Sequence, residues 1–317
     1  MRKFLGKKPE SLDFQDIIYE KKDFVARVAF NRPEVYNTYR TETLRELLIA
    51  FEDAANDDSV AVVVLTGTGD KAFCTGGDVN EYASDFNAVP RDFVKWGNLF
   101  MSVNDKLRHM GKPTIARVNG MAVGGGNEFQ LSCDLAIAAE HAKMFQVGTS
   151  VGSVAAVSCW FLPLAIGDRR AREMLLLNRR LDAKTALEWG LVNQVVPYEK
   201  LDEAVDEMAG QLVDKFSDCL RFTLLQTNYF KDQVAAAQQG NTTDWLAMHF
   251  MGLESYEGMN SFVEKRKMDH RRIRKLAAEG ESSEYLWGAP VRKCSKCGTK
   301  GIPDKFKFCG VCGNELD

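Results

Sequence analysis

The run SVAVVVLTG, residues 59–67, constrains the fold of this chain more than any other segment. It is apolar and rich in β-branched residues without polar alternation, which is typical of a strand buried on both faces. A helix-like segment, ETLRELLIAFEDAANDD, precedes it. After another helix-like segment near residues 90–110, the strand-like run KPTIARVNG follows. Strands that alternate with helices predict an α/β protein with a parallel sheet and right-handed crossovers.

The length and composition fit one large domain or two modest ones, since 317 residues with 45% hydrophobic content can bury a full core. We expect a core over residues 1–200, a helical region over 201–278, a linker over 279–293 and a small ribbon over 294–317. The formal net charge is −3, so nothing global favours a nucleic acid or an anionic membrane. No apolar run approaches the ~20 residues that span a bilayer, and we expect a cytoplasmic protein.

The eight cysteines fall into two groups. Four stand among apolar neighbours, where a free thiol behaves as a small buried hydrophobe: Cys74, Cys133, Cys159 and Cys219. The others form two Cys-x-x-Cys pairs, each followed by glycine: Cys294, Cys297, Cys309 and Cys312. Four thiolates on two tight turns suit tetrahedral zinc with no open position, so the spacing predicts a structural zinc ribbon that folds around its metal. Disulfides are the alternative, which a reducing cytoplasm disfavours.

Two familiar motifs do not fit their contexts. The run GTGDKA, residues 67–72, follows a strand as a dinucleotide fingerprint does, but the next residues, FCTGGD, are not helix-like. The run GTSVG matches a hydrolase nucleophile elbow at Ser150. Only His249 and His270 follow it as candidate bases, both in helix-like segments, and no upstream oxyanion motif is present.

Two glycine-bearing turns follow neighbouring predicted strands, KAFCTGGD at 71–78 and NGMAVGGGNE at 119–128. Ligands bind at such carboxyl ends, and glycine lets the backbone approach them closely. Two N–H groups converging from these turns would hold one oxygen that becomes negative, an oxyanion hole. Glu128 stands beside the second turn as a candidate base; the alternative is a carboxylate that only favours a helix dipole.

The segments NRPEVYNTY, AFCTGGD, KPTIARVNGMAVGGGNEFQLSCDLAIA and ALEWGLVNQVVP resemble the crotonase (enoyl-CoA hydratase/isomerase) superfamily over roughly residues 14–270. The resemblance implies a crotonase-type ββα spiral core with a C-terminal helical trimerisation region, to which the small four-cysteine zinc ribbon is added. It implies that the amides of Gly77 and Gly125 hold the oxygen of a CoA thioester enolate, and that Glu128 matches one of two catalytic glutamates of family hydratases. It also implies a homotrimer or a dimer of trimers.

The second hydratase glutamate is missing, because the run MFQVGTSVGS places Gly148 at its position. Plain hydration usually needs two carboxylates to orient water and move protons. Gly148 and the following VGS resemble a branch with dihydroxynaphthoyl-CoA synthase and ring-opening hydrolases, although Ala155 stands where the synthase type has aspartate. The segment FCTGGDVNEYASDF looks closest to 6-oxocyclohex-1-ene-1-carbonyl-CoA hydrolase of anaerobic aromatic degradation. The expected reaction is hydrolytic ring opening of an alicyclic oxoacyl-CoA, with or without hydration.

Two further residues are candidates for the acyl site. Tyr82 either donates a hydrogen bond to a substrate carbonyl or packs the next helix. Ser153 either orients a water or caps a helix.

For CoA itself, the resemblance implies that four residues lie near the adenine: Val35, Lys71, Ala72 and Phe73. Lys265 and Lys267 begin a basic run with two interpretations. Either they neutralise the 3′-phosphate of a CoA bound to the same or a neighbouring subunit, or the run forms a solvated helix face.

The sequence leaves three classes of function open. The first is a C–C hydrolase on cyclic acyl-CoAs, and the second is a hydratase, lyase or synthase with the same pocket. The third is a non-catalytic acyl-CoA-binding adaptor that works through its ribbon. The glycine turns and Glu128 argue against the third, because a binder needs no enolate site. The ribbon has few basic residues for phosphates, so a nucleic-acid partner is not expected.

Overall fold

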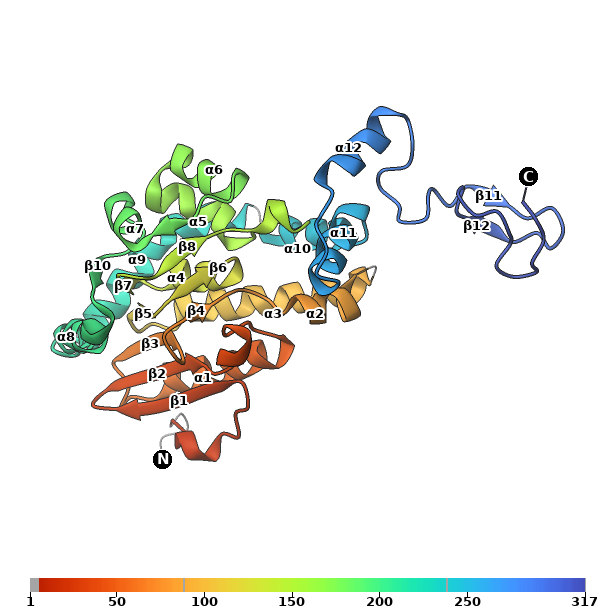
Figure 1. The fold of residues 1–317 in the computed structure, drawn as a ribbon. Coiled ribbons are helices and arrows are strands. Elements are labelled where there is room, and N and C mark those ends of the chain that lie inside the picture. The colour runs from red at the N-terminus through yellow and green to blue at the C-terminus, as the bar shows by residue number, and fades with distance from the viewer. Residues whose placement is uncertain (1–5, 88, 238, 317) are drawn as a thin grey trace. The chain divides into compact units, whose positions relative to one another are not determined.

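The computed structural model describes residues 6–87, 89–237 and 239–316 and contains a large sheet and a small one in its spiral core (Figure 1). The large sheet has the order β1-β2-β3-β5-β7-β10, in which β1 pairs antiparallel with β2 and the other pairs are parallel. Its strands are β1 (Ile17–Lys22), β2 (Val25–Phe30), β3 (Val62–Gly67), β5 (Thr114–Val118), β7 (Leu135–Ala139) and β10 (Gln194–Val196).

The small sheet has the order β4-β6-β8-β9. Its strands are β4 (Ala72–Cys74), β6 (Met121–Val123), β8 (Lys143–Phe145) and β9 (Leu181–Asp182). Strands β4, β6 and β8 run parallel, and β9 is antiparallel to β8. The chain places β3 then β4, β5 then β6, and β7 then β8, and a helical segment follows each pair. This repeated ββα unit confirms the predicted mixed α/β spiral.

Strand β3 is buried along its whole length, as the uninterrupted apolar run predicts. Its parallel neighbours β2 and β5 pair with it on either side. Helix α8 (Leu201–Val213) covers one face of the large sheet, where Leu201 and Val205 pack with Val64 and Ile137. Removing these apolar side chains from water is the main term that stabilises this layer.

The chain divides into two compact units. The first comprises Met1–Asp78, Val94–Thr149 and Val154–Asp244, and the second comprises Val79–Phe93, Ser150–Ser153 and Trp245–Asp317. The helices of the first unit, two of which extend past its limits, are α1 (Thr41–Asn56), α3 (Pro90–His109), α4 (Gly125–Ser132), α5 (Val157–Ile166), α6 (Asp168–Leu176), α7 (Ala183–Trp189), α8, α9 (Ser217–Ala236) and α10 (Gln239–His249). Its short 3₁₀ turns are η1 (Pro9–Ser11), η2 (Pro33–Val35), η4 (Gly148–Ser150), whose last residue belongs to the second unit, and η5 (Tyr198–Lys200).

The second unit is helical apart from a terminal hairpin. It contains α2 (Val79–Glu81), the π-helical turn η3 (Tyr82–Phe86), α11 (Leu253–Val263), α12 (His270–Ala278), β11 (Arg292–Lys293) and β12 (Lys300–Ile302). Helix α11 packs against α2 and η3. In the described part of the chain, no helix is both long and apolar enough to traverse a bilayer.

Two expectations from the sequence are wrong in detail. Cys74 and Cys133 are buried as predicted, but Cys159 and Cys219 are exposed, because they lie on outward faces of α5 and α9. Ser153 does not cap a helix, because α5 begins at Val157 and its N-cap residue is Ala156.

Candidate active site and cysteine cluster

The candidate active site lies where three parallel strands of the small sheet end. The turn with Gly77 follows β4, the turn with Gly125 follows β6, and Gly148 follows β8 after a short connection. Neighbouring parallel strands place their carboxyl ends at the same edge of a sheet. The two predicted donor turns are therefore adjacent, and position 148 follows the next strand along.

The amide of Gly77 is left over by the pairing of its neighbours. The N–H of Tyr39 donates to the Gly76 carbonyl at 2.9 Å, and the N–H of Asp78 donates to the Tyr39 carbonyl at 2.8 Å. A parallel bridge of this kind uses the residues on either side of Gly77 and leaves its own N–H out. Within the described residues, no acceptor is seen for that N–H.

The amide of Gly125 is a second donor for which the described part of the chain offers no acceptor. Gly125 is the first residue of α4, and first-turn amides have no acceptor inside their own helix. The preceding Gly124 has φ 54° and ψ −124°, a conformation that favours glycine. A Cβ placed on Gly76 would lie 3.5 Å from the Gly125 nitrogen, so the two turns touch. Two main-chain donors from touching turns are suited to an oxygen that gains negative charge.

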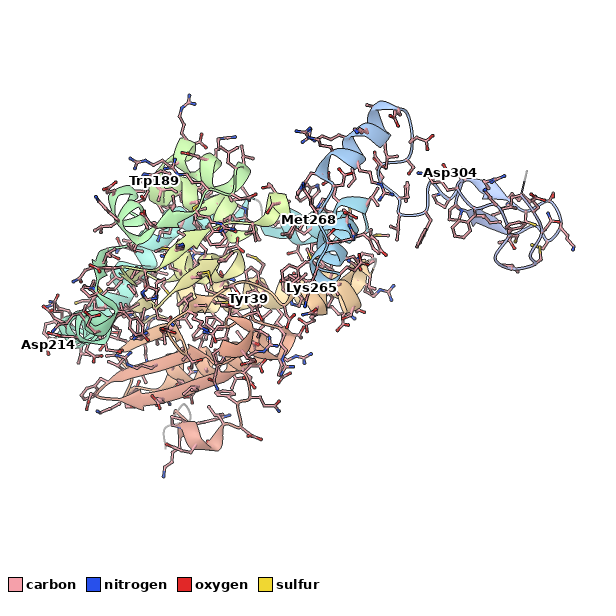
Figure 2. All side chains as sticks on the ribbon, viewed as in Figure 1. Tyr39, Trp189, Asp214, Lys265, Met268 and Asp304 are labelled. Atoms are coloured by element: carbon pink, nitrogen blue, oxygen red, sulfur yellow. The ribbon has the colours of Figure 1, made fainter. Side chains whose placement is uncertain are left out.

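Packing imposes a second requirement on the glycine run. A Cβ at Gly125 would lie 2.0 Å from the Tyr39 hydroxyl oxygen, and one at Gly126 would lie 1.9 Å from the Cys74 carbonyl oxygen. Tyr39, labelled in Figure 2, is only 3% exposed. Its ring packs against three other aromatic rings: Trp96, Phe100 and Phe129. Tyr39 lies in the segment NRPEVYNTY, but nothing in that segment alone indicates its contact with Gly125.

Glu128 is buried, with 4% of its surface exposed. The Ser158 N–H donates to its Oε1 at 2.7 Å, so the carboxyl group lies at the N-terminus of α5. Burial raises the pKa of Glu128 to about 7, while hydrogen bonds from Ser158 and from the amides of Val157 and Ala156 oppose the rise. A carboxyl group with this pKa can both accept and release a proton near neutral pH.

Gln146 connects the donor peptide to the surroundings of Glu128. Its Nε2 donates to the Gly124 carbonyl at 3.1 Å and to the Ser158 hydroxyl at 2.7 Å. The Gly124 carbonyl belongs to the same peptide group as the Gly125 N–H, so this contact fixes the direction of that donor. Gln146 lies in the quoted run MFQVGTSVGS, but its role is visible only in the structure, where its side chain is buried.

Position 148 brings no side chain to the strand ends. In the two glycine-bearing segments, residues 71–78 and 119–128, the carboxylates are those of Asp78 and of Glu128, which lies in the first turn of α4. Asp78 lies 3.1 Å from the Arg32 guanidinium, in an ion pair. Glu128 is therefore the candidate for proton transfer among these two carboxylates, and it is buried against the N-terminus of α5.

The residues expected near the adenine come from two joined segments of the first unit. Val35 ends η2, and Ala72 and Phe73 are buried in β4 directly after the exposed Lys71. The Nδ2 of Asn37 donates to the Ala72 carbonyl at 2.8 Å. The structure thus brings the segment after η2 alongside β4.

The other predicted residues belong to the second unit. Tyr82 begins η3 and packs edge-on against Phe250, with ring centroids 6.0 Å apart. Ser153 lies in a segment without regular structure. Lys265, labelled in Figure 2, and Lys267 are exposed between α11 and α12.

The four C-terminal cysteines form one cluster. Their Sγ atoms all lie within 4.8 Å of one another, with 3.6 Å between Cys294 and Cys312 and 3.7 Å between Cys297 and Cys309. Tetrahedral zinc with Zn–S bonds of about 2.3 Å requires sulfur separations of about 3.8 Å. The geometry is therefore compatible with a metal site made of four thiolates.

The two cysteine pairs form equivalent turns. The Gly298 N–H donates to the Cys294 carbonyl at 3.0 Å, and the Gly313 N–H donates to the Cys309 carbonyl at 2.8 Å. Both glycines have positive φ, at 78° and 70°. The glycine after each Cys-x-x-Cys pair thus closes its turn, as the sequence suggested.

A cleft of about 510 Å³ elsewhere on the first unit does not involve the glycine turns. It is lined by Glu20, Lys22, Asp23, Val25, Arg27, Asp206, Gly210, Val213 and Asp214. Its walls come from β1, β2 and α8 and lack Glu128, so we do not regard it as the active site.

Two sheets linked by repeated ββα units, with glycine-bearing turns at the strand ends, define a crotonase-type protein. The chain belongs to the enoyl-CoA hydratase/isomerase family, whose model matches residues 20–272. The cysteine cluster lies beyond the matched residues.

Solved structures of similar fold cover most of the chain. An enoyl-CoA hydratase from Mycobacterium avium subsp. paratuberculosis K-10 is 25% identical, with a TM-score of 0.71 over 81% of this chain and 98% of its own. An enoyl-CoA hydratase/isomerase from Xanthobacter autotrophicus Py2 is 27% identical, with a TM-score of 0.72 over 84% of this chain and 96% of its own. A monofunctional enoyl-CoA isomerase from M. smegmatis is 32% identical, with a TM-score of 0.59 over 68% of this chain and 94% of its own.

Proposed function

We propose that this protein acts on acyl-CoA thioesters and stabilises a thioester enolate between the amides of Gly77 and Gly125. The observation that carries the proposal is the contact between the two turns, each with an amide that has no acceptor within the described residues. Loss of one such donor typically costs about 3 kcal/mol of activation free energy. Family membership supports an acyl-CoA substrate.

The reaction that we propose is hydrolytic opening of an alicyclic oxoacyl-CoA ring. Glu128 removes a proton from water, and the hydroxide adds to the ring ketone. The bond between the former ketone carbon and the carbon next to the thioester then breaks, which leaves a carboxylic acid and a thioester enolate. Glu128 returns its proton to the enolate carbon, so one water is consumed and no other reactant is needed. The glycine at position 148 supports this reaction over plain hydration, which usually uses two carboxylates.

The second candidate is hydratase, lyase or synthase activity in the same site. We include isomerisation of a double bond in this second candidate. The solved relatives are named as hydratases and an isomerase. A proton shuttle between two carbons needs only one carboxyl group with a pKa near neutrality, and Glu128 has such a pKa of about 7.

Mass spectrometry of a panel of CoA thioesters separates these candidates. The panel contains 6-oxocyclohexene-carbonyl-CoA, 2-oxocyclohexane-carbonyl-CoA and crotonyl-CoA. Ring opening adds water irreversibly, whereas hydration comes to an equilibrium with its substrate. Isomerisation shifts a double bond without changing the mass, so it is followed by chromatography. Binding without turnover of any thioester would instead indicate the acyl-CoA-binding adaptor.

The roles of the remaining residues extend the same proposal. The adenine lies against Val35 and the backbone of residues 71–73, and Lys265 or Lys267 neutralises the 3′-phosphate. Tyr82 and Ser153 serve the acyl group. We further propose that the four cysteines hold one structural zinc in a protein of the cytoplasm, where thiols stay reduced.

A homotrimer, or a pair of trimers, is the assembly that we propose. Helix α9 exposes apolar side chains at helical spacing, and these are Phe222, Leu225, Tyr229 and Phe230. Exposed apolar surface of this kind usually marks a protein contact. Light scattering of the purified protein measures the number of chains directly, and a monomer at micromolar concentration would reject the assembly.

A further inference from the structure

The first turn of α5 meets the carboxyl group of Glu128 with donors from its backbone and from one side chain. The amides of Ala156, Val157 and Ser158 donate to that carboxyl group, and the Ser158 hydroxyl group donates to it as well. The first amides of a helix have no acceptor in their own helix, so α5 would hold a carboxylate here even without the hydroxyl group. The serine side chain therefore has a separate role to explain.

The Ser158 hydroxyl group has a second partner. The Nε2 of Gln146 donates to the Ser158 Oγ at 2.7 Å, so this oxygen accepts from Gln146 while its hydrogen is donated to Glu128. The same Nε2 donates to the Gly124 carbonyl at 3.1 Å. Ser158 and Gln146 are both buried. Hydrogen bonds in series polarise one another in a buried setting, so Gln146 makes the Ser158 hydroxyl group a stronger donor.

The needs of α5 alone do not account for this serine. The N-cap position belongs to Ala156, and Ser158 is the second residue of the helix. The rest of α5 is apolar apart from Cys159, and a buried hydroxyl group in such a helix is costly unless it is hydrogen-bonded. The partners that satisfy it are Gln146 and Glu128, which belong to the candidate site.

We propose that Ser158 is a positioning residue for proton transfer, because its hydroxyl group, held by Gln146, orients the Glu128 carboxyl group and stabilises its ionised form. The proton transfer itself rests on the proposed function. Burial raises the pKa of Glu128 to about 7, and the hydroxyl group opposes that rise, because it donates to the charged form. The ionised form is the one that removes a proton from water. Ser158 thus keeps a larger share of Glu128 in the active form near neutral pH.

The other ionisable groups packed around Glu128 are thiols. Partial desolvation and the charge of Glu128 raise the pKa of Cys159 on α5 to about 11, and burial raises that of Cys74 on β4 to about 12. Burial also raises the pKa of Cys133, directly after α4, well above its ordinary value. Neither β6 nor the rest of α4 has an ionisable side chain. A titration midpoint near pH 7 in this part of the first unit therefore belongs to Glu128.

A carbon-13 NMR titration of labelled glutamate carboxyl groups tests the inference without any substrate. Glu128→Gln identifies the Glu128 signal by its loss. We expect Ser158→Ala to move the Glu128 midpoint upward by about one pH unit, because a hydrogen bond to a charged group is lost. On a thioester that the protein turns over, kcat/KM should then fall by up to about tenfold at pH 6.5 and by less than about threefold at pH 9. A merely structural loss would lower the rate equally at both pH values.

Ser132→Ala is the matched control. Ser132 is also a buried serine, on α4, and its hydroxyl group donates to the Asn104 Oδ1 at 2.9 Å. This variant should lower the melting temperature without moving the Glu128 midpoint. If Ser158→Ala does not fold, Ser158→Cys keeps an atom at the position with a much weaker donor, and it must show the same upward displacement.

The two proposals fail in different ways. An unchanged Glu128 midpoint in the Ser158 variants overturns the inference, even in a protein that turns over acyl-CoA thioesters. A displaced midpoint in a protein that turns over no thioester of the panel rejects the proposed function, and the role of Ser158 in proton transfer with it.

Discussion

At the scale of single residues, Glu128 combines deep burial with hydrogen bonds from the first turn of α5. Its pKa of about 7 means that the carboxylate required to activate water forms only as the pH rises through neutrality. We expect kcat/KM to increase from pH 5.5 to 8 with a midpoint near 7. Glu128→Gln should lower kcat by about 10²- to 10⁴-fold while CoA affinity changes only a few fold.

The control for that experiment is Glu140→Gln, an equivalent change at an exposed position. It should retain the wild-type rate and pH profile. Unchanged turnover in Glu128→Gln would remove Glu128 from the mechanism.

The same pKa makes a prediction about stability. Unfolding returns Glu128 to its ordinary pKa of 4.5, so the folded state holds the proton more tightly between about pH 4.5 and 7. The free energy of unfolding therefore falls as the pH rises through this window, by at most about 3–4 kcal/mol at 1.36 kcal/mol per unit. Glutamine does not ionise, so Glu128→Gln should gain stability relative to wild type at pH 8 compared with pH 4. Urea unfolding at the two pH values measures this, and a pH-independent difference contradicts it.

The glycine run predicts a ranking of alanine variants. Gly126→Ala meets the Cys74 backbone carbonyl, which cannot move alone, whereas Gly125→Ala meets the Tyr39 hydroxyl. We expect Gly126→Ala to destabilise by about 3 kcal/mol or more, and Gly125→Ala by about 1–3 kcal/mol. Tyr39→Phe removes the nearest atom, so it should partly rescue Gly125→Ala and not Gly126→Ala. Denaturant midpoints of the single and double variants measure both effects. A Gly125→Ala variant less stable than Gly126→Ala would refute the ranking, and simple additivity of Tyr39→Phe with Gly125→Ala would refute the rescue.

The sequence predicts which residues make up the candidate site better than it predicts the residues that hold them in position. The glycine turns and Glu128 are visible because their residue types are informative in one dimension. Tyr39 contacts Gly125 from 86 positions away, and no local pattern reveals such a contact. Likewise, Gln146 is recognisable only when the fold brings it to Ser158, and the Ser158 amide only when the fold brings it to Glu128.

At the scale of elements, periodicity identifies the helices and strands that are long and buried. The run at β3 and the helix at α3 appear where they were expected. The two-residue strand β9 was not expected, because it lies inside a segment with helical spacing and pairs with the distant β8. Short strands owe their existence to pairing, so their own residues hardly specify them.

Helices α3 and α9 are joined by a cluster of ionisable groups. His109 contacts Asp105 in its own helix and Asp232 in α9, each at 3.1 Å, and Arg108 also pairs with Asp232. The hydrogen bond to Asp105 and then that to Asp232 raise the pKa of His109, while burial opposes the rise. The contacts of protonated His109 therefore stabilise the folded state fully at pH values below the ordinary pKa of 6.5. This stabilisation is lost as the pH rises through the higher pKa of the folded state.

We expect His109→Gln to destabilise the protein at pH 5.5 by less than about 1 kcal/mol, because the group is partly exposed, and to have no effect at pH 9. Urea unfolding at both pH values measures this. Thr223→Ala, an exposed change on α9, should show no such pH dependence. A larger effect at pH 9 than at pH 5.5 would show that neutral His109 makes the contact.

At the scale of the whole molecule, the family match and the cysteine cluster occupy separate stretches of chain. The match ends at residue 272, and the first cysteine of the cluster is Cys294. The ribbon has only a few buried residues of its own, among them Ile302 between the cysteines. A segment of this size cannot fold by burial alone, and the proposed zinc would supply the stability that burial does not.

Removal of the metal should therefore unfold the ribbon and leave the spiral core folded. We expect one zinc per chain by elemental analysis, and its loss with a strong chelator should collapse the amide NMR signals of residues 294–316 into the random-coil range. Zinc binding supplies on the order of 10 kcal/mol to such sites, far more than the ribbon's apolar contacts. Cys309→Ser should reproduce the effect without chelator, whereas Cys219→Ser, outside the cluster, should not. Persistence of the ribbon signals without metal would reject the zinc site, and loss of the core signals as well would show that the two stretches fold together.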